Sequence, residues 1–363
     1  MFDLKKIVMC VWNDFDNDDR IQKKATTLSK KYYVVVKSIC KQPKPNKIKL
    51  VNDNLRVEYY SFENKFFWFW NRLINNKKFW RDKIEPAHLY DCNDPDTLNA
   101  GVLAKKRYDS EILYDSHEFW KGTRRLESDI YYTLYAYIGN SILYLREKKL
   151  VKNATAITTV SDYIADELWS MYSRPVCVIP NYSYSNPYRK LLSEQKQQNK
   201  TAVFFGSKIR LGVQSSFDYL TKIGWKCIFI GGSKPLTDKN IKQTGFLDRN
   251  NYQKELANCD VGILDYRVTC DNIKYSMPNK LYEYIQAGLP IITNNKLLSV
   301  AKFVRKNNIG IILNNNKSNQ YLLQELETNL QEYKKNIYNI SQKYTWENQE
   351  QKILKYYDLV LDL

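Results

Sequence analysis

Short runs of apolar, largely β-branched residues alternate along the chain with longer amphipathic stretches. In the first half, the apolar runs predict strands at 6–12, 32–36, 55–60, 87–91, 111–116, 156–160 and 176–180. The amphipathic stretches predict helices at 19–31, 95–108, 129–152 and 161–171. The runs are continuously apolar, which is typical of parallel strands that helices bury on both faces. The first half is therefore expected to form a doubly wound α/β domain.

The second half repeats this scheme after a polar segment. Its apolar runs predict strands at 201–206, 226–231, 261–266, 290–294 and 310–314. We therefore expect a first domain at 1–183, a linker at 184–200 and a second domain at 201–340. A helix at 341–363 is amphipathic and could cap its own domain, but we expect it to cross back to the first. The predicted fold class is α/β, with two tandem Rossmann-like domains facing a central cleft that binds the ligand.

Composition and charge narrow the function classes. The chain has 363 residues, 44% of them hydrophobic, and no apolar run near the roughly 18 residues of a membrane span. Its start is not typical of a secretory signal, and its seven cysteines never occur as CxxC, so we expect a cytosolic protein without disulfides or zinc. The formal net charge of +17 favours an anionic partner: nucleic acid, anionic lipid or a phosphorylated small molecule.

The most specific segment is SMPNKLYEYIQAGLPIITN at 276–294. A Pro-Asn turn begins a helix that carries Lys280 and Glu283 near its first turn, and the helix ends at Gly288 before a buried strand. A helix N-terminus with a lysine is suited to an anion, and a carboxylate one turn later can accept hydrogen bonds from a ribose diol. A well-capped amphipathic helix, with Glu283 stabilising the helix dipole, is the alternative explanation.

This segment resembles the donor-site helix of retaining glycosyltransferases of family 4, which have the B-type fold. Further segments are similar to landmarks of that family in the same order: 18–36, 91–106, YDSHEFW at 114–120, 154–168, VIPNYS at 178–183 and 344–361. The resemblance therefore covers nearly the whole chain. It implies transfer of a sugar from a nucleotide-sugar to an acceptor, with retention at the anomeric carbon and without a metal or other cofactor.

The resemblance also implies a donor site in the second domain. Glu283 matches the family glutamate that binds the donor ribose, and the segment around Phe246 and Leu247 resembles the part that covers the base. The remaining donor-binding candidates are Gly206, Lys208, Arg210, Tyr275, Ser276, Asn279 and Lys280. Two departures are notable. Lys208 or Arg210 would have to replace a family lysine that directly precedes a glycine, and Tyr275 stands where the family often has a glutamate that touches the sugar.

Polar residues that follow the predicted strands of the first domain are the catalytic candidates. The resemblance places His117 at the reaction centre, and Asp94 is our candidate for holding or deprotonating the acceptor hydroxyl, with a helix N-cap as its alternative role. Asn13 and Asp14 lie in the expected active-site loop. Asp14-Phe15-Asp16 is formally a DxD metal motif, but that motif marks another glycosyltransferase fold, so no metal site is expected.

An aromatic and basic segment at 58–83 suggests contact with a membrane. A helix of aromatic residues bordered by cations suits the interface of an anionic bilayer, although packing against the first domain would also explain it. The residues expected to contact membrane or acceptor are Phe67, Trp68, Trp70, Lys77, Lys78, Trp80 and Arg81.

Together these features predict a cytoplasmic glycosyltransferase that lies at the inner face of the cell membrane. It is expected to move a hexose from a UDP-sugar, or secondly a GDP-sugar, to a surface-glycan acceptor, such as a lipid-linked oligosaccharide of capsule or O-antigen type. No nucleic-acid partner is expected. The alternatives are a sugar-nucleotide epimerase of similar fold and, in another class, a basic protein that binds nucleic acid or another polyanion.

Overall fold

The computed structural model describes residues 4–123, 130–189, 200–232, 235–314 and 319–362. The chain divides into two compact units. Unit 1 contains Met1–Pro180, Cys270–Asn272 and Glu350–Leu363, and unit 2 contains Asn181–Thr269 and Ile273–Gln349. The predicted linker at 184–200 lies largely outside the described residues.

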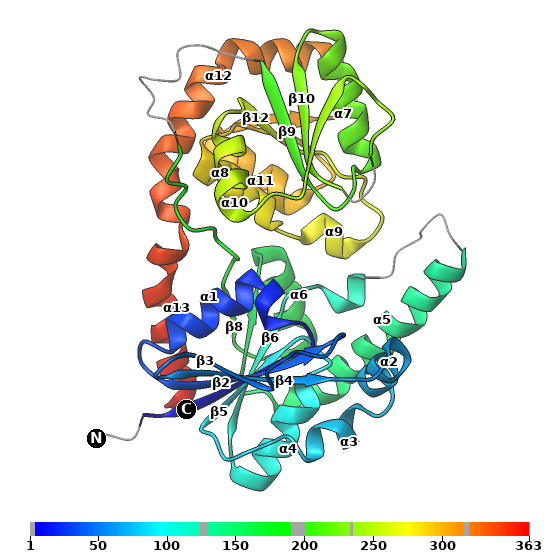
Figure 1. Ribbon diagram of the computed structural model, residues 1–363. Helices are drawn as coiled ribbons and strands as arrows, with labels where there is room; N and C mark the ends of the chain where they lie inside the picture. Colours follow the sequence, from blue (N-terminus) through cyan, green and yellow to red (C-terminus); the bar gives the residue numbers. More distant parts are fainter. Residues whose placement is uncertain (1–3, 124–129, 190–199, 233–234, 315–318, 363) are drawn as a thin grey trace. The chain divides into compact units, whose positions relative to one another are not determined.

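Unit 1 is built on an eight-stranded sheet with the order β3-β4-β2-β1-β5-β6-β7-β8 (Figure 1). Its strands are β1 (Lys6–Val11), β2 (Tyr33–Cys40), β3 (Ile48–Asn52), β4 (Leu55–Ser61), β5 (Leu89–Asn93), β6 (Glu111–Ser116), β7 (Ala156–Thr159) and β8 (Val176–Val178). All neighbours pair in parallel except β3, which is antiparallel to β4. The predicted strands are all present. The edge strand β3 is an addition that apolar runs could not indicate, because all its residues are exposed.

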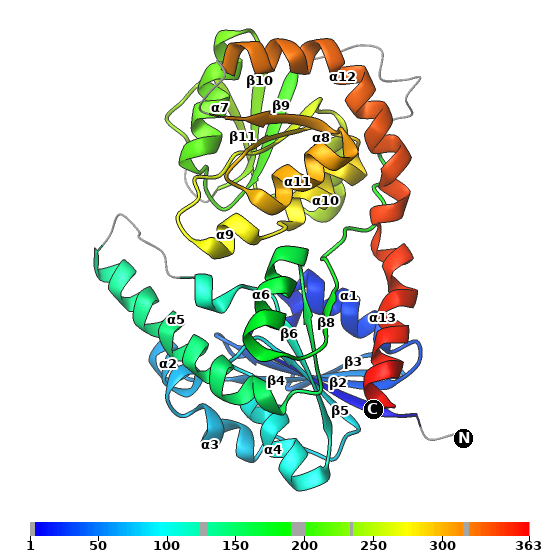
Figure 2. The ribbon, with the colours of Figure 1, turned by 180° about the vertical axis from the view of Figure 1, so that it is seen from behind.

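Helices cover both faces of this sheet (Figures 1 and 2). They are α1 (Asp19–Leu28), α2 (Lys65–Leu73), α3 (Asn76–Arg81), α4 (Leu98–Tyr108), α5 (Ile130–Leu150), α6 (Asp162–Tyr172) and, from Glu350 onward, α13 (Trp346–Leu361). Lys24 of α1 and Tyr357 of α13 both bond to the side chain of Asp91, so these helices share one face. A Cβ on Gly101 of α4 would lie 2.7 Å from Cys92 Sγ, and consecutive strand residues point to opposite faces. Helix α4 therefore covers the other face.

Unit 2 is a parallel six-stranded sheet with the order β11-β10-β9-β12-β13-β14. Its strands are β9 (Thr201–Gly206), β10 (Lys226–Gly231), β11 (Ile241–Gly245), β12 (Val261–Leu264), β13 (Ile291–Asn294) and β14 (Gly310–Leu313). Its helices are α7 (Leu211–Lys222), α8 (Arg249–Ala257), α9 (Asp271–Tyr275, shared with unit 1), α10 (Asn279–Ala287), α11 (Leu298–Asn307) and α12 (Asn319–Ser341). The winding direction reverses between β9 and β12, so ligands are expected at the carboxyl ends of these strands.

The fold class expected from the sequence is confirmed: each unit has a largely or wholly parallel sheet with helices on both faces. Every strand predicted for the second half is present, and β11 is an addition whose sequence, IKQTG, has a single apolar side chain. Within the described parts of the chain, no helix combines the length and the apolar character that a membrane span requires.

Candidate active site

Helix α10 begins beside the end of strand β9 and brings Lys280 to the carboxyl edge of the unit 2 sheet. A Cβ added to Gly206, the last residue of β9, would lie 3.7 Å from Lys280 Cε. The half-buried ammonium lies 5.6 and 5.0 Å from the ring centroids of Phe204 and Phe205. Burial, followed by the positive charge of Arg210, lowers the pKa of Lys280 to about 8. A cation destabilised in this way gains from binding an anion.

Arg210 adds a second cation at this edge. It precedes the first residue of α7, its side chain makes no capping hydrogen bond, and its guanidinium carbon lies 4.7 Å from the centroid of the Tyr266 ring. The Tyr266 ring lies 6.1 Å from the Phe204 ring, centroid to centroid, so Arg210 and Lys280 contact two neighbouring rings. Lys208 is exposed in the same loop. Together with the backbone N–H groups of the first turn of α7, these side chains form an edge suited to a diphosphate.

Glu283 lies on α10 three residues after Lys280, so the two side chains share one face of the helix. Glu283 is half-buried. A carboxylate one turn beyond a phosphate-binding lysine can accept hydrogen bonds from a sugar diol. The arrangement is compatible with the ribose-binding role that the resemblance implies for Glu283.

Two apolar candidates lie in the loop between β11 and α8. Phe246 is 70% exposed, and Leu247 is half-buried. An exposed phenylalanine at the carboxyl end of a strand offers a flat surface on which a nucleobase can stack.

The remaining donor candidates lie between α9 and α10. The ring of Tyr275 lies below the Lys274 ammonium, 5.0 Å from centroid to nitrogen, and its carbonyl accepts a hydrogen bond of 2.5 Å from Ser299. The Ser276 hydroxyl donates to the carbonyl of Ile273, at 3.1 Å. Asn279 is exposed at the first position of α10.

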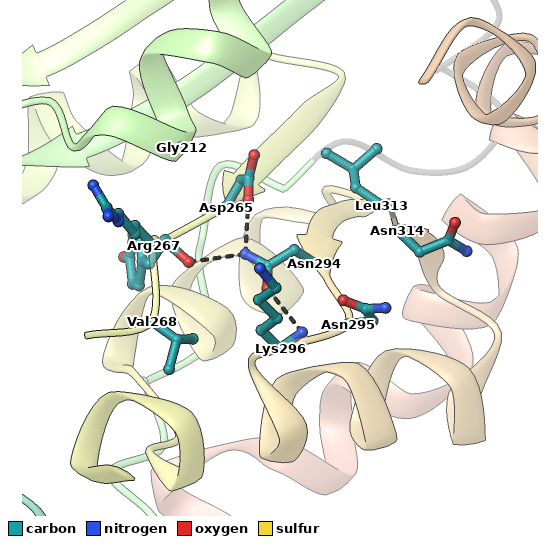
Figure 3. A pocket seen from close by; sticks show the side chains of 10 residues that line it. Gly212, Asp265, Arg267, Val268, Asn294, Asn295, Lys296, Leu313 and Asn314 are labelled. Carbon is teal, nitrogen blue, oxygen red and sulfur yellow. Dashed lines mark hydrogen bonds between the residues drawn. The ribbon is translucent and has the colours of Figure 1, made fainter. Parts of the chain in front are cut away.

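Unit 2 also contains a cavity of about 580 Å³ beside the ends of β12, β13 and β14 (Figure 3). Its walls are formed by Gly212, Asp265, Tyr266, Arg267, Val268, Asn294, Asn295, Lys296, Leu313 and Asn314. None of the donor candidates lines this cavity. The cavity could not be predicted from the sequence, because its walls come from loops that follow separate strands.

In unit 1, His117 lies between two carboxylates. Its Nε2 is 3.1 Å from Asp115 Oδ2, and its Nδ1 is 3.5 Å from Asp94 Oδ2. Burial acts to lower the pKa of His117, but the charges of Asp94 and Asp115 outweigh it and raise the pKa above its ordinary value. His117 keeps part of its side chain exposed, at 19%, so it could both titrate and contact a ligand.

Asp94 is not a helix cap, which was the alternative role considered from the sequence. The N-cap of α4 is Thr97, and Asp94 has a left-handed backbone with a φ of 64°. Its Oδ1 accepts hydrogen bonds of 3.0 Å from both the His117 backbone N–H and Trp120 Nε1. Asp94 therefore positions His117 and the loop after β6.

A buried charge network lies next to this histidine, and the sequence analysis did not identify it. The Asp115 carboxylate accepts from Arg20 (2.8 Å) and Lys24 (2.5 Å), while Lys24 also pairs with Asp91 (2.9 Å). All four side chains are less than 8% exposed. Arg20 and Lys24 are one turn apart on α1, so the helix directs two cations into unit 1. The network fixes Asp115, and Asp115 in turn fixes the imidazole of His117.

The loop after β1 holds its carboxylates with cations of its own unit. Asp14 pairs with Lys44 at 2.7 Å, and the Asn13 side-chain amide donates to Asp18 at 3.1 Å. Asp18 is the N-cap of α1. Among the described residues, no group of three or more histidine, cysteine, aspartate or glutamate side chains is arranged to hold a metal ion.

Comparison with known proteins identifies the class of enzyme. Residues 212–354 match the family model described as "Glucosyltransferase 3-like, C-terminal domain". The protein is a B-fold glycosyltransferase. Among curated proteins, none matches the chain.

Solved structures of similar fold agree with this class. Sucrose-phosphate synthase from Thermosynechococcus elongatus aligns with a TM-score of 0.74 at 12% identity and covers 99% of both chains. HepE from Anabaena, in complex with UDP and glucose, aligns with a TM-score of 0.67 at 14% identity, covering 98% of this chain and 99% of its own. The trehalose-6-phosphate protein from E. coli, bound to UDP-2-fluoroglucose, aligns with a TM-score of 0.66 at 10% identity and covers 99% of both chains. The family model thus supports the glycosyltransferase class expected from the sequence, and the solved structures confirm the expected B-type fold.

The aromatic segment of this glycosyltransferase differs from the expectation. It forms the end of β4 and two helices, α2 and α3, and the expectation that Trp68 and Trp80 contact a membrane is wrong. Trp68 is 4% exposed and Trp80 is 0% exposed, because both pack against Trp12 in the core of unit 1, and Trp80 also packs against Phe79. The other candidates are exposed: Phe67, Trp70, Lys77, Lys78 and Arg81.

Proposed function

We propose that this glycosyltransferase transfers a hexose from a UDP-sugar, with retention of anomeric configuration, to a lipid-linked oligosaccharide of a surface glycan. The observation that carries the donor part is the pair of cations, Lys280 and Arg210, at the start of α10 and α7. Burial lowers the pKa of Lys280 to about 8, and a bound diphosphate would offset the cost of burying its charge. A UDP donor is preferred to a GDP donor because similar folds have been solved with UDP, in HepE and in the trehalose-6-phosphate protein.

In this proposal, Lys280, Arg210 and the N-terminus of α7 stabilise the negative charge that develops on the leaving diphosphate. Glu283 accepts hydrogen bonds from the ribose, and Phe246 stacks on the base. These groups need no metal to neutralise the diphosphate, so we propose a metal-independent reaction. In unit 1, Asp115 fixes the imidazole of His117 through Nε2, and Nδ1 donates a hydrogen bond to a hydroxyl of the transferred sugar. Asp94 is the proposed residue that holds or deprotonates the acceptor hydroxyl.

The test is a thermal-shift panel of UDP, GDP and their glucose conjugates, measured with a chelator present. A ligand that binds only the folded protein raises the melting temperature. We expect UDP and UDP-glucose to stabilise the protein, Glu283→Ala to reduce the shift, and the exposed control Glu332→Ala to retain it. Stabilisation by GDP compounds alone would mean that the donor is a GDP-sugar. No shift with any nucleotide would overturn the proposed donor site.

The acceptor part of the proposal rests on the α2 patch, defined as Phe66, Phe67, Trp70 and Ile74. These side chains are 68, 45, 47 and 58% exposed. Contiguous apolar side chains of this size are uncommon on a surface unless they bind a partner. Exposed cations on the neighbouring helix α3 (Lys77, Lys78 and Arg81) complement an anionic bilayer.

Helix α5 lies beside α2, because a Cβ on Gly139 would lie 3.7 Å from Leu73 Cδ1. The neighbouring α5 residues Tyr137 and Ile138 are also exposed apolar side chains of unit 1. We therefore propose that unit 1 binds the inner face of the cell membrane, where a lipid-linked acceptor would be presented.

Co-sedimentation with vesicles tests this part. Vesicles of phosphatidylcholine with phosphatidylglycerol should retain the protein, and vesicles of phosphatidylcholine alone should retain it weakly. Phe67→Ser combined with Trp70→Ser should release it, whereas Trp169→Ser, at another exposed tryptophan of unit 1, should not. If the vesicles retain the Phe67→Ser, Trp70→Ser variant as well as the Trp169→Ser variant, the α2 patch does not bind the membrane. The proposed donor site would be unaffected.

A further inference from the structure

The cavity beside β12, β13 and β14 is separate from the donor candidates and contains unpartnered cations. We propose that it binds an anionic sugar, meaning a sugar that bears a phosphate or a carboxylate. The cavity measures about 580 Å³, within the range of small-molecule sites and far larger than a single oxyanion. This site is an addition to the proposed donor site and does not depend on it.

The charge of the cavity comes from two loops. Arg267 follows β12, Lys296 follows β13, and both are exposed side chains at the cavity wall. Among the described residues, neither forms an ion pair or a side-chain hydrogen bond. Figure 3 shows Arg267 and Lys296 among the side chains that line the cavity around Asn294. Two cations on one wall without a carboxylate partner attract an anion, and an arginine presents a planar fork that fits a phosphate or a carboxylate.

The single carboxylate of the wall is already engaged. Asp265 accepts a hydrogen bond of 2.7 Å from the Asn294 amide through Oδ1, and one of 2.8 Å from the Ser216 hydroxyl through Oδ2. Asn294 also donates to the carbonyl of Tyr266, at 2.9 Å, and its own oxygen accepts from the Lys296 backbone N–H at 2.9 Å (Figure 3). Asp265 therefore ties the ends of β12 and β13 together and does not neutralise Arg267 or Lys296 as an ion-pair partner.

The backbone contributes to the same site. A Cβ on Gly212, in the first turn of α7, would lie 2.4 Å from the Asp265 carbonyl oxygen, so only a glycine allows this approach. The close approach places Gly212 at the cavity wall and holds the loop after β12 against α7.

The rest of the wall suits the body of a sugar. Asn295 and Asn314 present amides, which donate to and accept from hydroxyl groups. Val268 and Leu313 present apolar surface, on which the C–H face of a pyranose ring can pack. An inorganic anion would use only the cations, whereas a sugar with an anionic group would use both parts of the wall.

Isothermal titration calorimetry with glucose 6-phosphate, glucuronate, glucose and inorganic phosphate tests the proposal. We expect glucose 6-phosphate or glucuronate to bind, and to bind at least tenfold more tightly than glucose or inorganic phosphate. The ligand that binds more tightly shows whether the site prefers a phosphate or a carboxylate. Arg267→Ala and Lys296→Ala should each weaken that ligand roughly tenfold or more. The control Lys226→Ala removes an exposed cation at the opposite end of strand β10 and should leave binding unchanged.

A second set of variants separates this site from the donor site. Lys280→Ala should weaken UDP but leave the anionic sugar unaffected, and Arg267→Ala should do the reverse. The proposal is overturned if none of the four probes binds, if Lys280→Ala abolishes binding of the anionic sugar, or if inorganic phosphate binds as tightly as glucose 6-phosphate. If the wild-type protein does not bind UDP, the proposed donor site is contradicted, but the proposed anionic-sugar site is not.

Discussion

The hydroxyl of Tyr357 donates a hydrogen bond of 2.7 Å to Asp91, although 266 residues separate the two in the sequence. Asp91 is fully buried at the centre of the unit 1 sheet, and burial raises its pKa although the charge of Lys24 opposes the rise. The C-terminal helix α13 therefore completes a buried polar network and is an integral part of unit 1.

Removing members of this network should destabilise unit 1 to different degrees. Lys24→Met leaves two buried carboxylates with one cation fewer, and we expect a loss of about 3–5 kcal/mol in unfolding free energy. Tyr357→Phe removes a single donor and should cost about 1–3 kcal/mol. Urea unfolding followed by tryptophan fluorescence measures both. The exposed residue Lys355 on α13 provides the control Lys355→Met, expected within about 0.5 kcal/mol of wild type. Wild-type stability of Lys24→Met would show that the network contributes nothing.

His117 should titrate above the ordinary histidine range. The charges of Asp94 and Asp115 raise its pKa in the folded protein against the effect of burial, with the charge of Arg20 also acting to lower it. The imidazolium therefore contributes stability that is full below the unfolded-state pKa, about 6.5, and is lost as pH rises through the folded-state pKa. Nuclear magnetic resonance of the imidazole C–H signals measures the midpoint directly. The chain has only two histidines, so His88→Gln assigns the signals.

The melting temperature provides the second measurement on His117. Wild-type protein should lose stability as pH rises through the folded-state pKa of His117, and His117→Asn should lack that step. A midpoint at or below 6.5 would mean that burial outweighs the two carboxylates.

Most strands could be predicted because burial on both faces leaves a local signal, a continuous apolar run. The exposed strand β3 and the mostly polar strand β11 have no such signal. The site on α10 was predictable for a similar reason, since Lys280 and Glu283 lie within one turn of one helix. A short local segment therefore contains enough information to place both side chains on the same face.

Features that depend on distant segments could not be predicted in this way. The sequence shows aromatic residues in α2 and α3 but not which face meets the core, so Trp68 and Trp80 were assigned to the surface. Lys24 is ordinary on a polar helix face, and its burial becomes tolerable only because Asp91 and Asp115 converge on it from separate strands. The cavity with Arg267 likewise requires loops after three strands to meet.

Glu283 should bind the donor through the ribose. Glu283→Ala is expected to weaken UDP roughly tenfold to a hundredfold, because a hydrogen bond to a charged group is lost. The deoxyribose analogue of UDP should bind the wild-type protein more weakly than UDP does, and Glu283→Ala should weaken the analogue by a smaller factor. Calorimetry measures the four affinities. Equal effects of the substitution on UDP and its deoxy analogue would mean that Glu283 does not read the ribose hydroxyl that the analogue lacks.

Lys280 should take up a proton when the diphosphate binds. Its pKa in the free protein is lowered to about 8, so at pH 8.5 most of its side chains are neutral, whereas a bound diphosphate favours the charged form and raises the pKa. Binding of UDP at pH 8.5 should then be accompanied by uptake of roughly three-quarters of a proton, and the affinity should fall as pH rises above 8. Calorimetry in two buffers of different ionisation enthalpy measures the uptake. Lys280→Arg keeps the positive charge and should bind UDP without it. Uptake that persists in Lys280→Arg would place the titrating group elsewhere and would remove Lys280 from the diphosphate site.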